Sequence, residues 1–324
     1  MKCDLCSHDA VIFVRYNGAH LCAIHFMEYV ERRVKKEIRK QINLKPGDKI
    51  GVAVSGGKDS MTTLHLLYKT FEKRNDIEIH CITVDEGIEK YRLSGINAAE
   101  KYCKDKKIPF HLVSFKDIFG LTMDEVASIA KENSPCTYCG VFRRKCMNLV
   151  AKKINANYIA TGHNLDDISQ SILMNFVRGD VERLTRLGPH KRIQPGLIPR
   201  FIPLRMIPES ESLLYAMVSK IDFCNMTCPY REKAIRNQYR SIINELDMRS
   251  PGSKFSILSS YDQICPILVN NLEKTTLTKC KCGEPSLSKK CKACELAEKA
   301  TKKLNKGQPE EITNSDLFPF DTIG

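Results

Sequence analysis

Apolar and polar residues are arranged along the middle of the chain in blocks that predict strands and helices in turn. Short apolar runs of strand length stand at residues 49–55, 77–84, 110–115 and 158–161. Apolar residues at helical spacing stand at 29–42, 61–71 and 93–106. Strands that alternate with helices are joined by right-handed crossovers, so the pattern predicts an α/β fold with a Rossmann-like parallel sheet covered by helices on both faces. Ligands of such sheets bind beyond the carboxyl ends of the strands.

The helix predicted at 29–42 has one apolar face and one strongly basic face. Val30, Val34, Ile38 and Ile42 recur at the spacing of a single helix face. The other face carries six basic residues: Arg32, Arg33, Lys35, Lys36, Arg39 and Lys40. A solvated surface explains this face slightly better than a groove dedicated to RNA, and both interpretations stay open.

Composition divides the chain into four parts. Residues 1–28 form a short segment that bears cysteine and histidine, and residues 29–270 form a catalytic domain in which strands and helices are expected to alternate to about residue 265. Residues 271–300 are rich in cysteine and lysine. Residues 301–324 form a polar tail that we expect to be flexible.

Charge and cysteine content add the first functional constraints. The chain carries 51 Lys and Arg against 38 Asp and Glu, a net charge of +13, which predicts a polyanionic partner, most often nucleic acid. No apolar run is long enough to span a membrane, and no signal peptide precedes the first cysteines, so we expect a cytoplasmic protein. Fifteen cysteines in that compartment indicate metal binding or catalysis rather than disulfides.

Two clusters near the ends of the chain have the spacing of zinc ligands. Thiolates and imidazoles are the ligands that zinc prefers, and a bound ion replaces the core that such short segments lack. The spacing predicts two structural zinc ions, held by Cys3, Cys6, Cys22 and His25 in the first cluster and by Cys280, Cys282, Cys291 and Cys294 in the second. Candidate contacts to RNA phosphates are the lysines of the second cluster (279, 281, 289, 290 and 292) and the basic residues 183, 186, 191, 192, 200 and 205.

The sequence SGGKDS at 55–60 lies where the first predicted strand meets a helix. Gly56 and Gly57 let the backbone approach an anion closely, and the following helix start offers free N–H groups and a positive dipole end. Lys58 and Ser60 add a charge and a hydroxyl group for phosphate. The spacing is not that of a Walker loop, because Gly57 stands where that motif has lysine.

Three cysteines in the central region form a second candidate centre. Cys136 and Cys139 make a CxxC motif, and such a pair alone is compatible with redox chemistry, half a zinc site or part of an iron–sulfur site. Cys228 is the natural third partner, because like Cys136 it stands beside a proline in a turn-like setting. Cys224, four residues earlier, stays open as an alternative ligand.

The SGGKDS loop is the signature of the PP-loop ATP pyrophosphatases, which cleave ATP between its α and β phosphates. Further segments, CTYCGVFRR at 136–144, VDEGI at 84–88, ATGHNLDD at 160–167 and MNFVRGD at 174–180, resemble the cytosolic tRNA 2-thiolation family of these enzymes. That family includes the NcsA-type thiolases of the wobble uridine and the TtuA enzymes, which thiolate a T-loop uridine. The resemblance covers nearly the whole chain. Arg143 favours the wobble group, because TtuA proteins tend to have lysine there.

The resemblance implies a set of functional residues. It implies a 4Fe-4S cluster held by Cys136, Cys139 and Cys228, catalytic roles for Arg143 and Asp167, and Mg²⁺ beside the phosphates. It places ATP against Ala53, Ser55, Gly56, Gly57, Lys58, Asp59, Ser60, Val84, Asp85 and Gly162. It also implies tRNA as partner, sulfide or a sulfur-carrier protein as donor, and a homodimer. For Asp166 and Asp167, helix capping is as good an explanation as Mg²⁺ coordination or proton handling.

The implied reaction is ATP-dependent sulfur transfer to tRNA. The uridine C2 oxygen attacks the α-phosphate, pyrophosphate leaves, and sulfur then displaces AMP to give 2-thiouridine. Alternatives are a persulfide route through the same cysteines, 2-thiolation of a T-loop uridine, and a lysidine-type amine ligase, which needs no sulfur machinery. A non-catalytic zinc-ribbon RNA-binding protein is the alternative from another class, and the complete SGGKDS loop counts against it.

Overall fold

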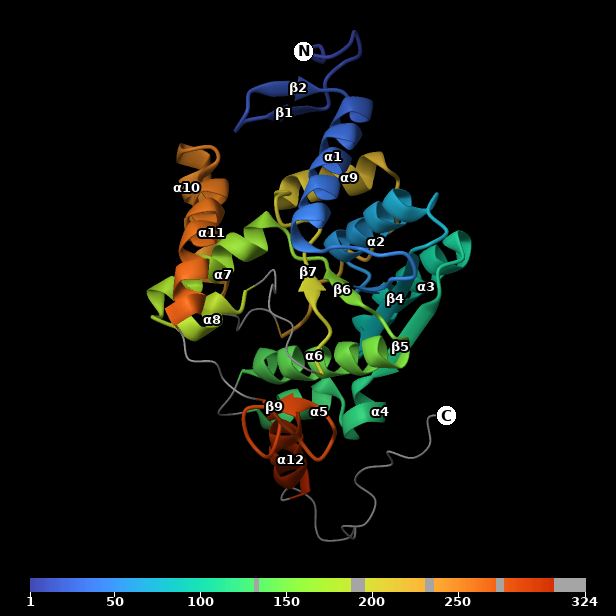
Figure 1. Ribbon diagram of the computed structural model, residues 1–324, viewed down its shortest axis with the longest axis vertical. Helices are drawn as coiled ribbons and strands as arrows, with labels where there is room; N and C mark the ends of the chain where they lie inside the picture. Colours follow the sequence, from blue (N-terminus) through green and yellow to red (C-terminus); the bar gives the residue numbers. More distant parts are fainter. Residues whose placement is uncertain (131–133, 188–195, 231–235, 272–276, 306–324) are drawn as a thin grey trace.

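The computed structural model describes residues 1–130, 134–187, 196–230, 236–271 and 277–305. Its centre is a five-stranded sheet in the order β5-β4-β3-β6-β7 in which every pair of neighbours is parallel (Figure 1). The strands are β3 (Lys49–Ala53), β4 (Glu78–Asp85), β5 (Phe110–Ser114), β6 (Tyr158–Thr161) and β7 (Arg200–Phe201). The parallel sheet predicted from the sequence is confirmed, and each predicted strand lies within two residues of its observed bounds.

The strand order reverses at the middle of the sheet. From β3 the chain moves outward through β4 to β5, and it then returns to the other side of β3 as β6. The loops that leave β3 and β6 therefore diverge from neighbouring strand ends, and this divergence opens the crevice where such sheets bind ligands. The SGGKDS loop follows β3 and Gly162 follows β6, so both predicted nucleotide segments lie at this crevice.

One face of the sheet is covered by four helices. They are α1 (Ala23–Gln41), α2 (Lys58–Phe71), α3 (Arg92–Lys106) and α9 (Glu209–Val218), and their apolar residues share one core with β3. Val30, Val34 and Ile38 of α1 are buried there, as the apolar spacing predicts. Helix α1 begins at Ala23, so it crosses the boundary predicted between residues 28 and 29.

The opposite face is covered by α6 (Pro135–Lys153) together with α4 (Phe115–Phe119) and α5 (Met123–Ile129). Both short helices begin with capping boxes, Ser114 with Asp117 and Thr122 with Glu125, which satisfy free N–H groups at each helix start. Figure 1 shows α6 on the other side of the sheet from α1 and α2. The prediction of helices on both faces is confirmed.

Beyond β6 the chain is mostly helical. Helices α7 (Leu165–Val177), α8 (Val181–Thr185), α10 (Arg236–Arg249) and α11 (Ser253–Asn271) pack together beside the sheet (Figure 1). The sequence interpretation extended alternating strands and helices to about residue 265, and this was wrong after β7. Leu258 and Tyr261 of α11 are buried against α7 and α8 rather than against a further strand.

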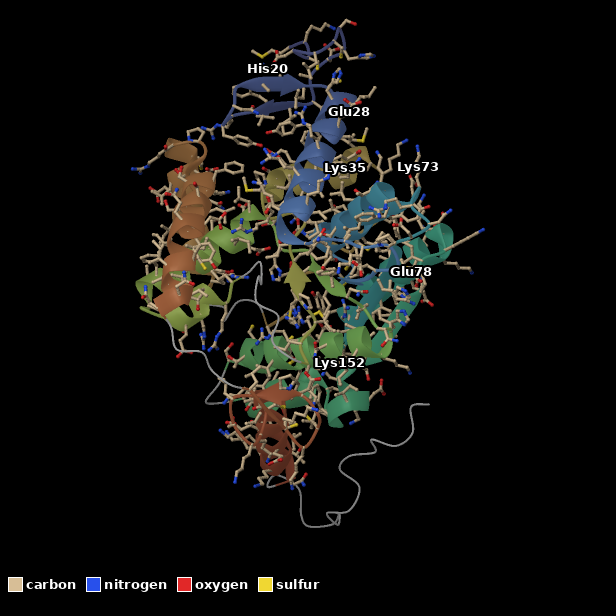
Figure 2. All side chains as sticks on the ribbon, in the orientation of Figure 1. His20, Glu28, Lys35, Lys73, Glu78 and Lys152 are labelled. Atoms are coloured by element: carbon tan, nitrogen blue, oxygen red, sulfur yellow. The ribbon has the colours of Figure 1, made fainter. Side chains whose placement is uncertain are left out.

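Small modules stand at both ends of the described chain. The first contains the hairpin β1 (Ile12–Val14) and β2 (Ala19–Leu21), and the second contains β8 (Thr278–Lys279), β9 (Pro285–Ser286) and α12 (Lys292–Asn305). The second module packs on α6, where Nζ of Lys152, labelled in Figure 2, lies 2.6 Å from Oε1 of Glu284. Helix α12 extends five residues into the predicted tail, and residues 306–324 lie outside the described residues. Among the described helices, none combines the length and apolarity that crossing a bilayer requires.

Candidate active site

The SGGKDS loop joins β3 to α2 in a conformation that requires glycine. Gly56 has φ of +82°, and a Cβ atom there would lie 2.1 Å from the carbonyl oxygen of Gly95. Ser60 closes the loop, since its Oγ accepts a hydrogen bond from the backbone N–H of Ser55 at 3.1 Å and donates one to the Gly57 carbonyl at 2.9 Å. The loop thus presents the N-terminus of α2, a site suited to phosphate.

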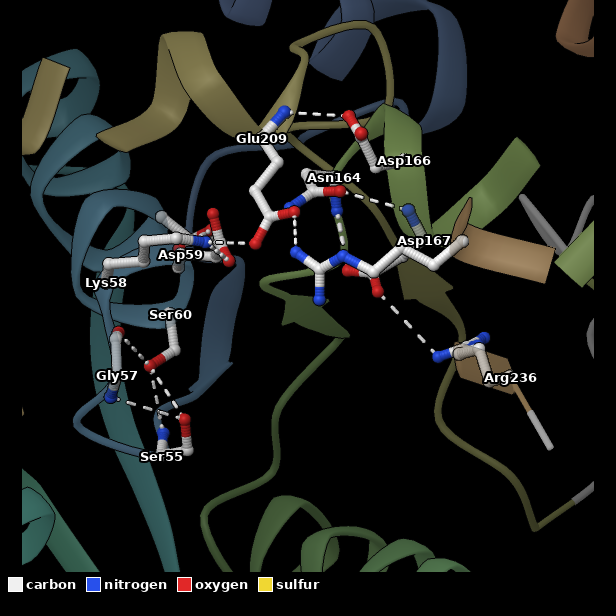
Figure 3. A network of polar contacts seen from close by, with 12 residues as sticks. Ser55, Gly57, Lys58, Asp59, Ser60, Asn164, Asp166, Asp167, Glu209 and Arg236 are labelled. Carbon is white, nitrogen blue, oxygen red and sulfur yellow. Dashed lines mark hydrogen bonds and ion pairs between the residues drawn. The ribbon is translucent and has the colours of Figure 1, made fainter. Parts of the chain in front are cut away.

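Lys58 is held over this loop by two carboxylates. Its Nζ lies 2.6 Å from Asp59 Oδ2 and 2.9 Å from Glu209 Oε1, as Figure 3 shows. Burial alone would lower the pKa of Lys58, but Asp59 and Glu209 outweigh it and raise the pKa. Glu209 begins α9, 151 residues from Lys58, and no sequence signal pointed to it. Phosphate that binds the loop must compete with Glu209 for this lysine.

The loop also offers a free carboxylate oxygen. Asp59 Oδ1 is buried and has no hydrogen-bond partner among the described residues. A buried anionic oxygen beside a phosphate-binding loop fits a hard divalent cation such as Mg²⁺. Asp85 ends the neighbouring strand β4, with its Oδ1 accepting a hydrogen bond from Gly87 N at 2.9 Å, and Ala53 and Val84 complete this edge of the sheet.

The turn after β6 forms the other wall of the crevice. A Cβ atom on Gly162 would lie 2.8 Å from Cα of Ser60, so glycine is needed for the turn to approach the loop. Asn164 caps α7 in a capping box with Asp167, whose Oδ1 also lies 3.7 Å from Arg236 Nη1 (Figure 3). Asp166 accepts a hydrogen bond from the Glu209 backbone at 2.8 Å. Both aspartates therefore have structural contacts, and Asp167 is the more exposed of the two.

Cys136, Cys139 and Cys228 line one cavity of about 620 Å³ on the α6 side of the crevice. Cys136 and Cys139 lie in the first turn of α6, which begins at Pro135, so the turn-like setting expected for Cys136 is the start of a helix. Thr161 and His163 reach the same cavity from the end of β6. The structure thus brings Cys228 into the same cavity as the CxxC pair, from which it is far away in sequence.

Tyr230 holds Cys228 beside Cys136. Its backbone carbonyl accepts a contact from Cys136 Sγ at 3.8 Å, and its backbone N–H bonds to Cys228. Its hydroxyl group donates to Asp124 Oδ1 at 2.6 Å, which fixes the segment to α5. Burial raises the pKa of both Cys139 and Cys228.

Cys224 belongs to a different place. Its backbone N–H donates to the Gly56 carbonyl at 2.8 Å, and its Sγ lies 3.0 Å from Ser94 Oγ. It therefore packs against the SGGKDS loop, and it is absent from the wall of the three-cysteine cavity. Cys81, Cys103 and Cys146 are buried and Cys265 is half-buried, and none of them belongs to the ligand groups found among the described residues.

Two arginines connect the cavity to the nucleotide loop. Arg143 donates to Cys139 Sγ at 2.9 Å, and its Nε lies 3.1 Å from Glu86 Oε1. The other oxygen of Glu86 lies 2.7 Å from Nε of Arg92, and Arg92 in turn donates to the Ser55 carbonyl. Burial would lower the pKa of Arg143, but Cys139 and Glu86 outweigh it and raise the pKa. Glu86 lies within the VDEGI segment, but no residue pattern there predicted a role for it.

The donor set of the cavity fits an iron–sulfur cluster with three protein ligands. Thiolates are the usual ligands of such clusters. The cavity offers three cysteine sulfurs, and the cationic Arg143 beside Cys139 counteracts the burial that raises the pKa of that thiol. None of the three belongs to the compact four-ligand groups found elsewhere in the described residues.

Those compact groups are the two predicted zinc clusters. In each, all four ligand atoms lie within 4.8 Å of one another. A tetrahedral zinc ion with Zn–S bonds of about 2.3 Å places its sulfur ligands about 3.8 Å apart. The Sγ atoms of Cys6 and Cys22 are 3.7 Å apart, and those of Cys282 and Cys291 are 3.6 Å apart. His25 Nδ1 lies 3.3 Å from Cys3 Sγ, so His25 rather than His8 or His20 completes the first set.

The basic residues considered for RNA contact differ in their surroundings. Arg205 is buried and pairs with Asp262 and Glu37, so its position rules out an RNA contact. Arg183 and Arg186 pair with acidic residues of their own helix region, and so do Lys290 and Lys292. Arg200 lines the three-cysteine cavity, while Lys191 and Arg192 lie outside the described residues.

Comparisons with known proteins give a family for this arrangement. The PP-loop domain family matches residues 28–246, and the N-terminal LIM domain of the 2-thiouridine synthetase TtuA matches residues 2–27. The tRNA 2-thiolation protein NcsA of Haloferax volcanii is 36% identical over 317 residues, which cover 92% of this chain and 98% of that protein. The tRNA-5-methyluridine(54) 2-sulfurtransferase of Pyrococcus horikoshii is 34% identical over 321 residues, which cover 99% of each chain.

A solved structure agrees with these relatives. The U34-tRNA thiolase NcsA from Methanococcus maripaludis, solved with its 4Fe-4S cluster, superimposes with a TM-score of 0.82 at 34% identity. The match covers 92% of this chain and 96% of that chain. With a nucleotide loop, a three-cysteine cavity and two terminal ligand clusters in one molecule, this chain belongs to the PP-loop tRNA 2-thiolation family.

Proposed function

We propose that this protein is an ATP-dependent tRNA sulfurtransferase that converts a uridine to 2-thiouridine. The observation that carries the proposal is the connection of the SGGKDS loop to the three-cysteine cavity through Arg92, Glu86 and Arg143. An amine ligase needs the loop but not the cysteines, whereas sulfur transfer needs both. The relatives named above are tRNA thiolation proteins.

The loop binds and activates ATP. Backbone N–H groups at the start of α2 hold the phosphates, and Lys58 adds positive charge once it leaves Glu209. Asp59, with its unpartnered buried oxygen, would hold Mg²⁺ beside them. The uridine C2 oxygen then attacks the α-phosphate and pyrophosphate leaves. This step converts a poor leaving group into AMP, and fixed donors around the phosphates stabilise the charge that develops.

The three-cysteine cavity binds the sulfur that is transferred to the uridine. A 4Fe-4S cluster held by Cys136, Cys139 and Cys228 would supply an open iron position for hydrosulfide. Arg143 stabilises negative charge beside Cys139, and Glu86 keeps the guanidinium in place. His163 lines the cavity wall, and burial lowers its pKa, so the ring is neutral and able to hydrogen-bond a nucleobase. Asp167 stands at the start of α7, where it is placed to accept a proton near the uridine.

The wobble uridine is the target that we favour. Arg143 stands where T-loop enzymes tend to have lysine, and its double contact with Cys139 and Glu86 uses the forked guanidinium, which lysine lacks. The T-loop uridine is the alternative target, because one relative acts on 5-methyluridine 54.

The remaining components follow from the same family. We propose structural zinc in both terminal clusters, sulfide or a carrier protein as sulfur donor, a homodimeric assembly and a cytoplasmic location. The net charge of +13 supports tRNA as the macromolecular substrate.

The test combines metal analysis with product analysis. Protein purified without oxygen is assayed for iron, acid-labile sulfide and zinc, and then incubated with tRNA, ATP, Mg²⁺ and sulfide before nucleoside mass spectrometry. We expect 2-thiouridine from the wild type, and loss of iron with retained zinc in Cys136→Ala, Cys139→Ala and Cys228→Ala.

Cys224→Ala is the matched control, because Cys224 lies on the same segment as Cys228 but outside the cavity. It should keep its iron. Zinc without iron after anaerobic reconstitution would refute the cluster and direct attention to a persulfide at the same cysteines. A wild type that holds iron but yields no 2-thiouridine in any tRNA would refute the function itself.

A further inference from the structure

Five arginines line the three-cysteine cavity, and three of them have acidic or hydroxyl partners. Arg143 pairs with Glu86, Arg186 pairs with Glu182, and Arg236 contacts Asp167 and Ser171. The other two are Arg144 on α6 and Arg200 on β7. Among the described residues, neither of these two has a carboxylate within ion-pair distance.

Arg144 and Arg200 are brought together by the fold. Nη2 of Arg200 donates to the backbone carbonyl of Arg144 at 3.3 Å, although 56 residues separate them. The guanidinium of Arg144 lies over Gly140, one turn earlier on α6, where an added Cβ atom would approach its Nη1 to 3.5 Å. This is ordinary van der Waals distance, so the Arg144 head group lies in contact range of Gly140, the residue that follows Cys139.

This arrangement concentrates positive charge, because no carboxylate of the described residues forms an ion pair with either guanidinium. Burial lowers the pKa of Arg144, and neighbouring Arg143 lowers it further. Burial and the charge of Arg144 lower the pKa of Arg200 to about 10, so both side chains stay charged at neutral pH. Two charged guanidiniums on a cavity wall are stabilised by a bound anion, and forked guanidinium groups suit the oxygen atoms of a phosphate group.

In this geometry, the anion that would bind Arg144 and Arg200 is not the phosphate chain of ATP. None of residues 55–60 is among those that line the cavity, and the ATP phosphates have their own site at the start of α2. An RNA strand carries a phosphodiester on each side of every nucleotide. A uridine that reaches the three cysteines therefore brings phosphodiester groups to the cavity wall.

We propose that Arg144 and Arg200 form a binding site for the phosphodiester backbone of the RNA beside the target uridine. This inference rests on the proposed function, since it takes the substrate to be RNA. The two arginines hold the strand through its backbone and read no base, so they position the uridine for whatever tRNA the rest of the protein selects.

The experiment measures binding of an unmodified tRNA transcript across a series of salt concentrations. Arg144→Gln and Arg200→Gln are compared with the wild type and with Arg144→Lys and Arg200→Lys. Arg74→Gln is the matched control, because Arg74 lies in the loop before the amino end of β4, is not among the residues that line the cavity, and pairs with Asp76. ATP affinity and iron content are measured on every variant.

Each glutamine variant should weaken transcript binding and reduce the slope of log K against log salt by about 1, as expected for one lost phosphate contact. The lysine variants should restore most of the slope, and Arg74→Gln should match the wild type. ATP affinity and iron content should stay unchanged throughout.

Two results would overturn the site. Slopes equal to that of the wild type in both glutamine variants would show that no phosphodiester contact is lost. A fall in ATP affinity with an unchanged RNA slope would assign the arginines to the nucleotide instead. Nucleoside analysis distinguishes failure of the phosphodiester site from failure of the proposed function. If the wild type makes 2-thiouridine while the slopes stay unchanged in the variants, only the phosphodiester site is refuted.

Discussion

Glu86 and Arg143 form an ion pair of 3.1 Å in which the Glu86 side chain is 4% exposed and the Arg143 side chain as a whole is 46% exposed. The same carboxylate pairs with Arg92, so one buried anion serves two cations on different sides of the crevice. Neither arginine side chain reaches both the nucleotide loop and the cavity. Glu86 is thus the residue through which the position of one site depends on that of the other.

Replacing Glu86 with glutamine removes the anion and leaves both arginines uncompensated. We expect a loss of about 3 kcal/mol in the free energy of unfolding, because breaking a buried ion pair leaves an uncompensated charge in the protein interior. We also expect thiolation to fall by at least tenfold, with a smaller change in ATP affinity, since Glu86 touches the loop only through Arg92. Urea denaturation and single-turnover thiolation measure the two effects.

The control for this variant is Glu245→Gln, which breaks an exposed pair with Arg249. That pair should contribute no more than about 1 kcal/mol. Equal effects of the two substitutions would contradict a special role for Glu86.

Glu209 competes with phosphate for Lys58. Glu209→Gln should release the lysine and tighten ATP binding about two- to fivefold, since a partly exposed ion pair is worth about 0.5–1 kcal/mol. Lys58→Gln should weaken ATP binding. Isothermal titration with ATP and Mg²⁺ measures both, and Asp222→Asn, which breaks the exposed pair with Lys101, serves as the neutral control. Weaker ATP binding in Glu209→Gln would mean that the carboxylate assists the nucleotide rather than opposing it.

The stability of the protein should fall with acid through His65. This residue packs against Tyr102 on the α2 side of the sheet, and burial lowers its pKa to about 4, against an ordinary value of 6.5. The unfolded chain therefore takes up the proton first, so the contribution of neutral His65 is complete above pH 6.5 and is lost as the pH falls toward 4. His65→Gln should flatten the decline of the urea midpoint over that range. Identical pH profiles of the wild type and His65→Gln would exclude His65 as the source of this decline.

The second four-cysteine cluster, Cys280 to Cys294, supports the helix that carries Cys136 and Cys139. Nζ of Lys145 on α6 donates to Cys294 Sγ at 3.5 Å, and Asn148 donates to Glu284 of the same module at 2.7 Å. Cys291→Ser should release zinc, open residues 277–305 to protease and lower iron retention on α6, because a short module without its ion loses its folding energy. Zinc and iron analysis with limited proteolysis tests this, with Cys265→Ser as control. Full iron retention after zinc loss would show that α6 keeps its structure without the second module.

Local patterns made the sheet and the ligand clusters predictable. The strand before SGGKDS, the glycines of the loop and the spacing of Cys3, Cys6, Cys22 and His25 are encoded by neighbours in sequence, and the structure has each in the expected form. The proline setting of Cys228 suggested it as the third partner of Cys136 and Cys139, the family resemblance supported it, and the cavity brings the three together.

Contacts between distant segments could not be predicted in this way. The Lys58–Glu209 pair spans 151 residues, and Glu209 stands at a helix start that no motif marks. The α10–α11 pair was missed because few of its residues are buried, so its apolar spacing is weak. Asp167 could be read from sequence as a cap or as a catalytic group, and the structure shows the capping contact without excluding the other role.

Gly56 offers a direct test of the geometry of the nucleotide loop. Gly56→Ala introduces a Cβ atom 2.1 Å from the Gly95 carbonyl oxygen at a φ of +82°, so the loop must move away from α3. Gly179 has a comparable φ of +63° but open space around its Cβ position, so Gly179→Ala bears the backbone strain without the clash. We expect Gly179→Ala to cost about 1 kcal/mol of stability and to keep ATP affinity. Gly56→Ala should lose ATP binding by at least tenfold, and ATP binding that is equal in the two variants would mean that the loop tolerates displacement from α3.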